Sequence, residues 1–106
     1  MCRMFAHQPQ SNYTYQTRSI RVGGHSTSIR LENVFWTILE EIAAREGNSV
    51  AKFITTLHDE VLQFHGEVSN LASLLRCSCL LYISTGSERK VPPEHVQRHA
   101  SMAAVL

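Results

Sequence analysis

The fold is decided by a stretch near the start of the chain, residues 17–32, which reads TRSIRVGGHSTSIRLE. Apolar and polar side chains alternate along it. Ile20, Val22, Thr27, Ile29 and Leu31 fall on one side, and Ser19, Arg21, Ser26, Ser28 and Arg30 fall on the other. Because successive side chains of an extended chain point to opposite faces, this period of two predicts strand with one apolar and one polar face.

The pair Gly23-Gly24 interrupts this alternation. Two glycines suit a hairpin turn that needs positive φ, and such a turn would set Ile20 opposite Thr27 and Arg21 opposite Ser26. The same glycines also suit a flexible hinge. The sequence leaves both interpretations open.

Three helices are expected after the strand. Residues 32–46 carry apolar side chains at helical spacing, and Gly47 ends the helix. Ser49 is the expected N-cap of a second helix, with Val50, Phe53, Ile54, Leu57 and Val61 facing inward. Ser69 or Asn70 caps a third, residues 71–83, which is apolar nearly all round and is therefore expected to be buried.

Length and composition fit one globular domain, residues 17–83, between an N-terminal arm, residues 1–16, and a flexible C-terminal tail, residues 84–106. Of the 106 residues 43% are hydrophobic and 18% are charged, and the net charge is only +1. The chain therefore has no strongly basic field, but four of its eight arginines, Arg3, Arg18, Arg21 and Arg30, fall in the first third, before the first acidic residue.

Three cysteines, an odd number, indicate reduced thiols, and we interpret Cys77 and Cys79 as buried small side chains. The start of the chain lacks the apolar core of a signal peptide, and residues 71–83 are too short to cross a bilayer. We therefore expect a cytoplasmic protein.

A lone strand or hairpin is marginal in water because its edges and its apolar face are uncovered. A second copy would complete it, with strands of two chains paired antiparallel and four helices over the apolar face. The expected fold is mainly α with a short β-ribbon, as an intertwined homodimer with an extra C-terminal helix. Two such dimers could also associate.

A two-stranded ribbon fits the major groove, where side chains reach base edges. The outward residues Ser26, Ser28 and Arg30 are the candidates for base contact, in preference to a merely solvated face. Phosphate contacts are expected from the start of the second helix with Lys52, and from His25. Arg18 and Arg21 are either phosphate contacts or solvated charges.

Three segments carry a family resemblance: residues 26–31, residues 35–43 and residues 45–50. Together they resemble the ribbon-helix-helix superfamily of Arc/MetJ-like proteins. That resemblance implies base contacts from Ser26, Ser28 and Arg30, and a phosphate clamp from Asn48, Ser49 and Val50. Residues 17–32, Phe35-Trp36 and residues 70–76 more specifically resemble an uncharacterised bacterial branch with a third helical segment. The likeness covers residues 17–83.

The function expected is a DNA-binding transcriptional regulator that acts on double-stranded DNA. The alternative is a dimeric protein-interaction module, or an antitoxin, whose third helix and tail hold a protein partner. No motif indicates an enzyme or a cofactor. Trp36 is interpreted as core rather than as a stacking platform, and His58 and His65 as helix-surface residues. His95 and His99 have the spacing of metal ligands, but we expect no metal there because no third ligand is evident.

Overall fold

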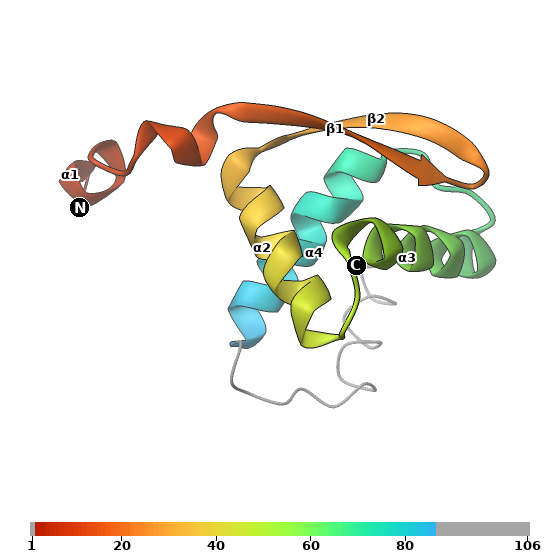
Figure 1. The fold of residues 1–106 in the computed structure, drawn as a ribbon. Coiled ribbons are helices and arrows are strands. Elements are labelled where there is room, and N and C mark those ends of the chain that lie inside the picture. Colours follow the sequence, from red (N-terminus) through yellow and green to blue (C-terminus); the bar gives the residue numbers. More distant parts are fainter. Residues whose placement is uncertain (1, 87–106) are drawn as a thin grey trace.

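The hairpin of the protein is the upper of two layers in a computed structural model, which describes residues 2–86 (Figure 1). Its strands are β1 (Tyr15–Val22) and β2 (His25–Glu32), which pair antiparallel from Tyr15 opposite Glu32 to Val22 opposite His25. Gly23 and Gly24 have φ of 59° and 83°, the positive values that a tight hairpin turn requires. The structure thus decides for the hairpin over the hinge.

The register confirms both faces that alternation predicts. Ile20 lies opposite Thr27 and Arg21 opposite Ser26, and Ile20, Val22, Ile29 and Leu31 are buried. One expectation changes: the partner of β2 along this edge is β1 of the same chain, because the glycine turn folds the chain back on itself. The ribbon therefore does not need a second copy for these backbone hydrogen bonds, and the homodimer stays a prediction.

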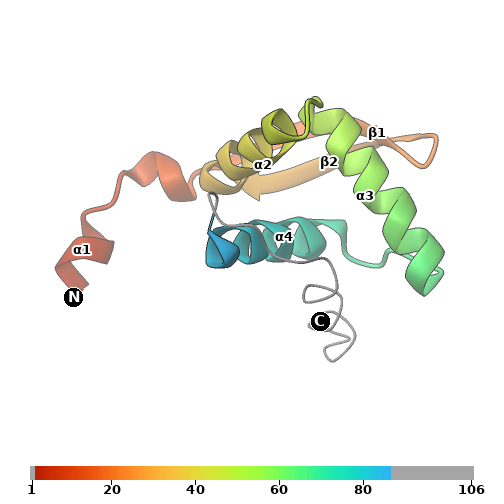
Figure 2. The same ribbon diagram turned by 90° about the horizontal axis from the view of Figure 1, so that it is seen from below.

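Three helices form the lower layer: α2 (Asn33–Arg45), α3 (Val50–His65) and α4 (Leu71–Thr85). α2 and α4 descend from the hairpin and contact each other (Figure 1), and α3 lies beneath its turn end (Figure 2). α3 packs against β1 and α4 against β2, while α2 contacts both strands. Among residues 2–86, these helices cover one face of the hairpin, and none of them packs on the other face.

The helix ends follow the predicted signals. After α2, the N–H groups of Gly47 and Asn48 donate to the carbonyl oxygens of Ala44 and Ala43 at 3.0 and 2.8 Å, the pattern of a Schellman C-cap. The Ser49 hydroxyl accepts from the Lys52 N–H at 3.1 Å and starts α3. Asn70 caps α4 in the same way, accepting from the Ser73 N–H at 3.1 Å.

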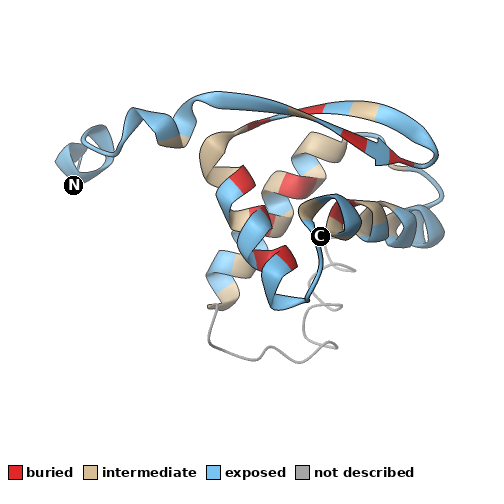
Figure 3. Ribbon diagram, viewed as in Figure 1, coloured by how far each residue is buried: buried red, intermediate tan, exposed pale blue. Residues whose placement is uncertain are grey.

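The core lies between the two layers, where the buried residues of strands and helices face each other (Figure 3). Its fully buried large side chains come from β2 and all three helices. They are Leu31, Trp36, Leu39, Ile54, Leu75 and Cys79. Trp36 is therefore part of the core, as interpreted from the sequence.

Two expectations about α4 are only partly met. Leu75 and Cys79 are buried, but Leu80, Leu81 and Ile83 are 62%, 42% and 55% exposed, because only one side of α4 packs against α2 and β2. Cys77 is exposed for the same reason, and only Cys79 is the buried thiol that was expected. Burial raises the pKa of Cys79 to about 11, so this thiol is protonated at neutral pH.

The expected N-terminal arm, residues 1–16, contains regular structure. α1 (Cys2–Ala6) and the short 3₁₀ helix η1 (Gln10–Tyr13) lie beyond one end of the hairpin (Figure 1). β1 begins at Tyr15, two residues earlier than the sequence pattern indicated, since Tyr15 and Gln16 still pair with β2. Most of the tail, with His95 and His99, lies outside the described residues.

The glycine turn yields a stability prediction. Gly24→Val should lower the free energy of unfolding by about 1–2 kcal/mol, since a branched side chain is disfavoured at positive φ. Gly24→Asn is the matched control and should cost clearly less, because asparagine tolerates this conformation. Nothing lies within 4 Å of a Cβ at this position, so the difference reports backbone strain alone. Urea unfolding measures both variants, and equal losses would contradict the turn geometry.

Candidate nucleic-acid interface

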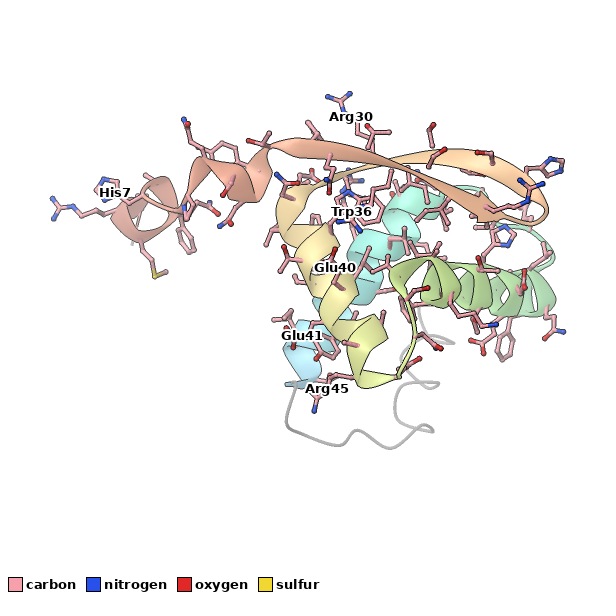
Figure 4. All side chains as sticks on the ribbon, in the orientation of Figure 1. His7, Arg30, Trp36, Glu40, Glu41 and Arg45 are labelled. Atoms are coloured by element: carbon pink, nitrogen blue, oxygen red, sulfur yellow. The ribbon has the colours of Figure 1, made fainter. Side chains whose placement is uncertain are left out.

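The outer face of the hairpin points away from the helices. We define it by six exposed side chains, Thr17, Ser19, Arg21, Ser26, Ser28 and Arg30. Figure 4 shows Arg30 projecting from this side. All six are hydroxyl or guanidinium groups, and none is acidic. Such a surface offers hydrogen bonds and positive charge without a competing carboxylate.

Arg30 is held in place by an aromatic ring. Its guanidinium carbon lies 4.1 Å from the centroid of the Tyr15 ring, a cation–π distance. Tyr15 pairs with Glu32 and Thr17 pairs with Arg30, so the two side chains are diagonal neighbours across the strands. The stack restricts Arg30 while leaving it exposed to solvent.

Arg21 occupies the other end of the outer face, beside the turn. Its backbone carbonyl accepts a hydrogen bond from the Thr55 hydroxyl at 3.0 Å, which ties β1 to α3. Within residues 2–86 its guanidinium makes no hydrogen bond, ion pair or ring contact. Between the two arginines, the hydroxyls of Ser19 and Ser26 lie 3.2 Å apart.

Arg18 has a different environment, because it lies on the inner face of β1. Its guanidinium stacks on Trp36 at 4.5 Å from the ring centroid, and its Nη2 is 2.8 Å from Oε2 of Glu40. Its Nε also donates to Gln16 at 3.1 Å, and the Trp36 indole N–H donates to the Gln16 carbonyl at 2.8 Å. Arg18 therefore links β1 to α2, and the structure does not bring it to the outer face.

The other sequence-predicted residues lie apart from the outer face as well. Asn48, Ser49, Val50 and Lys52 surround the start of α3, on the helix-covered side of the hairpin (Figure 1). Three of them are exposed, and Val50 is half-buried. His25 is exposed at the first position of β2, next to the turn. His58 is half-buried below the turn, whereas His65 is exposed.

Glu32, the first acidic residue of the chain, ends β2 two residues after Arg30. Its Oε1 accepts from Nε of Arg76 on α4 at 2.9 Å. The pKa of Glu32 lies below its usual value of 4.5, first because of a hydrogen bond from its own backbone. Partial burial acts in the opposite direction, and the hydrogen bond and charge of Arg76 lower the pKa further. The charge of Arg30 lowers the pKa as well, so the carboxylate bound to Arg76 also interacts with Arg30.

The same residues do not favour other kinds of site. The part of the chain that the structure describes has no group of three or more side chains placed to hold a metal ion. No helix between residues 2 and 86 is both long and apolar enough to span a membrane.

Thr17, Ser19 and Tyr15 were not predicted from the sequence as members or supports of a site. The alternation expected from the sequence begins at residue 17, and Tyr15 falls in the expected N-terminal arm. Extending the alternation two residues toward the N-terminus would have found Tyr15, because positions 15, 17, 19 and 21 share one face of β1.

Comparison with known proteins adds the family. A family model described as the ribbon-helix-helix domain matches residues 15–83. Among solved structures, the chain is similar to an uncharacterized protein from Bordetella pertussis Tohama I, with 45% sequence identity and a TM-score of 0.81. The match covers 88% of this chain and 74% of that one. No curated protein matches the chain.

The Glu32–Arg76 ion pair predicts a pH dependence of stability. A carboxyl whose pKa is lowered on folding stabilises the protein above its unfolded pKa, and this contribution disappears as the pH falls through the folded value. Glu32→Gln should therefore lower the free energy of unfolding at pH 7 by about 0.5–1 kcal/mol, since the pair is partly exposed. Denaturant titrations of wild type and Glu32→Gln at pH 7 and pH 3 measure this contribution. If the two proteins differ in unfolding free energy by the same amount at both pH values, the Glu32–Arg76 ion pair is not the source of the pH dependence.

Proposed function

The chain belongs to the ribbon-helix-helix domain family, and we propose that it is a transcriptional regulator that inserts the outer face of its hairpin into the major groove of DNA. Members of this family generally bind DNA and dimerise, and their domains are generally non-enzymatic. In this proposal Ser26, Ser28 and Arg30 contact base edges. The protein then acts in the cytoplasm, on the nucleoid.

The observation that carries the proposal is the composition of the outer face. A two-stranded ribbon has the dimensions of the major groove, and this one presents arginines and hydroxyls with no carboxylate among them. An arginine can donate two hydrogen bonds to a guanine, and a serine can donate or accept. Arg30 supports this proposal best, because Tyr15 already restricts its side chain.

Phosphate contacts complete the proposal. Arg21 and His25 lie at the turn end of the hairpin, where a ribbon in the groove would come near the backbone. The start of α3 offers the free N–H groups of a helix N-terminus together with Lys52, and these suit a phosphate. We leave Arg18 out of the interface because Trp36 and Glu40 hold it on the inner face.

DNA binding should depend on salt and on Arg30. The affinity for a duplex selected from a random pool should fall as salt rises, because phosphate contacts release counterions. Arg30→Ala should weaken binding to the selected duplex by about 1–3 kcal/mol, and should weaken binding to a random duplex much less. Fluorescence anisotropy at several salt concentrations measures both.

Arg45→Ala is the matched control, since it removes the same charge at the far end of α2 from the hairpin (Figure 4). It should change neither affinity by more than about twofold, because distant surface charges are screened. If Arg30→Ala loses equal affinity for the selected and the random duplex, Arg30 contacts the DNA backbone and not a base edge. Absence of duplex binding at low salt would contradict the proposed function.

We also propose that two copies associate through the exposed apolar side of α4, Leu80, Leu81 and Ile83, and that pairs of such dimers can meet on DNA. Apolar side chains this exposed on one helix are typical of an interface, and family members generally dimerise. The second candidate function uses the same surface: α4 holds a different protein, as in an interaction module or an antitoxin.

Sedimentation velocity separates these two uses of α4. The protein should sediment with the mass of two chains, and Leu80→Asp should shift it to one, because a charge in an apolar interface is costly. Phe64→Asp is the matched control, since Phe64 is 79% exposed on α3 and its replacement should leave the mass unchanged. A wild-type protein with the mass of one chain would contradict the dimer and favour a different partner on α4.

A further inference from the structure

The two strands of the hairpin carry nearly the same sequence. Residues 17–22 read TRSIRV and residues 26–31 read STSIRL, with identical Ser, Ile and Arg at the third, fourth and fifth positions. The first positions are both hydroxyl residues, and the last are Val22 and Leu31. The second positions differ, and they hold Arg18 and Thr27 on the inner face.

The register turns this repeat into a symmetry. Ser19 faces Ser28, so the two central serines of the repeat lie opposite each other. Thr17 faces Arg30, and Arg21 faces Ser26. In the repeat Thr17 corresponds to Ser26 and Arg21 to Arg30, so exchanging the two strands converts one pair into the other. A two-fold axis perpendicular to the sheet, between Ser19 and Ser28, therefore relates β1 to β2. A slip of the register in either direction would move this axis off the serine pair.

Both faces of the hairpin follow this axis. On the inner side Ile20 corresponds to Ile29 and Val22 to Leu31, and all four are buried. On the outer side Arg21 corresponds to Arg30, and both are exposed. The chain thus presents a two-fold arrangement of hydroxyls and arginines without needing a second copy.

We infer that the hairpin of a single chain reads a short inverted repeat in DNA, in which Arg30 contacts a guanine on one strand and Arg21, in place of the phosphate contact proposed above, contacts a guanine on the opposite strand. This inference rests on the proposed function and specifies its ligand. Arg21 and Arg30 are four residue positions apart along the strands, which is about 13 Å. At a rise of about 3.4 Å for each base pair, the two guanines lie about four base pairs apart.

The symmetry is incomplete at the ends of the hairpin. The position that corresponds to Tyr15 is Gly24 in the turn, so only Arg30 has a ring to stack on. Arg30 is therefore the better ordered of the two arginines, and its replacement should cost more affinity than that of Arg21.

The test begins with selection of duplexes from a pool with about twenty randomised base pairs, a length that exceeds one helical turn of DNA, using the full chain. The enriched sequence should contain an inverted repeat with guanines about four base pairs apart. In binding to that duplex, Arg21→Ala and Arg30→Ala should each lose about five- to hundredfold in affinity. Arg45→Ala serves again as the charge control, and circular dichroism checks that each variant is folded.

Changed duplexes test the equivalence of the two arginines. Wild-type protein should lose affinity when either guanine is replaced by adenine. Each single arginine variant should tolerate the loss of either guanine, because it can dock in both orientations, and should lose affinity only when both are replaced. A merely structural role of Arg21 or Arg30 would not produce this pattern.

Four results would overturn the inference. A selected sequence without two-fold symmetry, or an Arg21→Ala protein that still needs both guanines, would leave DNA binding intact and remove the equivalence of the arginines. Guanines about one helical turn apart would mean that two chains, and not the two strands of one hairpin, read the two halves of the inverted repeat. Failure of the wild-type protein to bind any duplex at low salt would overturn the proposed function and this inference together.

Discussion

The pairing of β1 with β2 is the interaction on which the rest of the structure depends. A two-stranded sheet is not stable by itself, and this hairpin persists because Ile20, Val22, Ile29 and Leu31 enter the core beneath it. The register fixes which side chains enter that core, since a slip of one residue would exchange the two faces. The same constraint that buries the apolar residues therefore exposes the arginines and serines.

The arginines show how strongly the face decides a side chain's role. Arg18 and Arg21 are three residues apart, yet Arg18 binds Glu40 and stacks on Trp36, whereas the Arg21 guanidinium is exposed. Glu32 is bound by Arg76 on α4, and the charge of Arg30 acts on it as well. The helices thus do more than cover the hairpin, because α2 also binds one of its cations, Arg18, and α4 binds one of its anions, Glu32.

The outer face uses small side chains, and this shapes how it would recognise DNA. Serine and threonine bring the backbone close to the floor of a groove, and only Arg21 and Arg30 reach far beyond it. Discrimination between sequences then depends on two long side chains and on their spacing, with shape and phosphate contacts supplying the remaining affinity. A symmetric pair of arginines makes good use of so few contacts.

The sequence by itself determined the strand pattern, the three helices with the cap of the second at Ser49, and the composition of the two faces of the hairpin, and it left the cap of the third helix open between Ser69 and Asn70. These features follow from local periodicity and from short-range hydrogen bonds. Only the tertiary structure decided that β1 pairs with β2 in the same chain, that Tyr15 stacks on Arg30, and that Arg18 turns inward. It also decided that Leu80, Leu81 and Ile83 stay exposed on α4. These outcomes depend on tertiary contacts between segments that are distant in the sequence. The local sequence of a glycine turn, of an arginine or of an apolar helix is compatible with more than one set of such contacts.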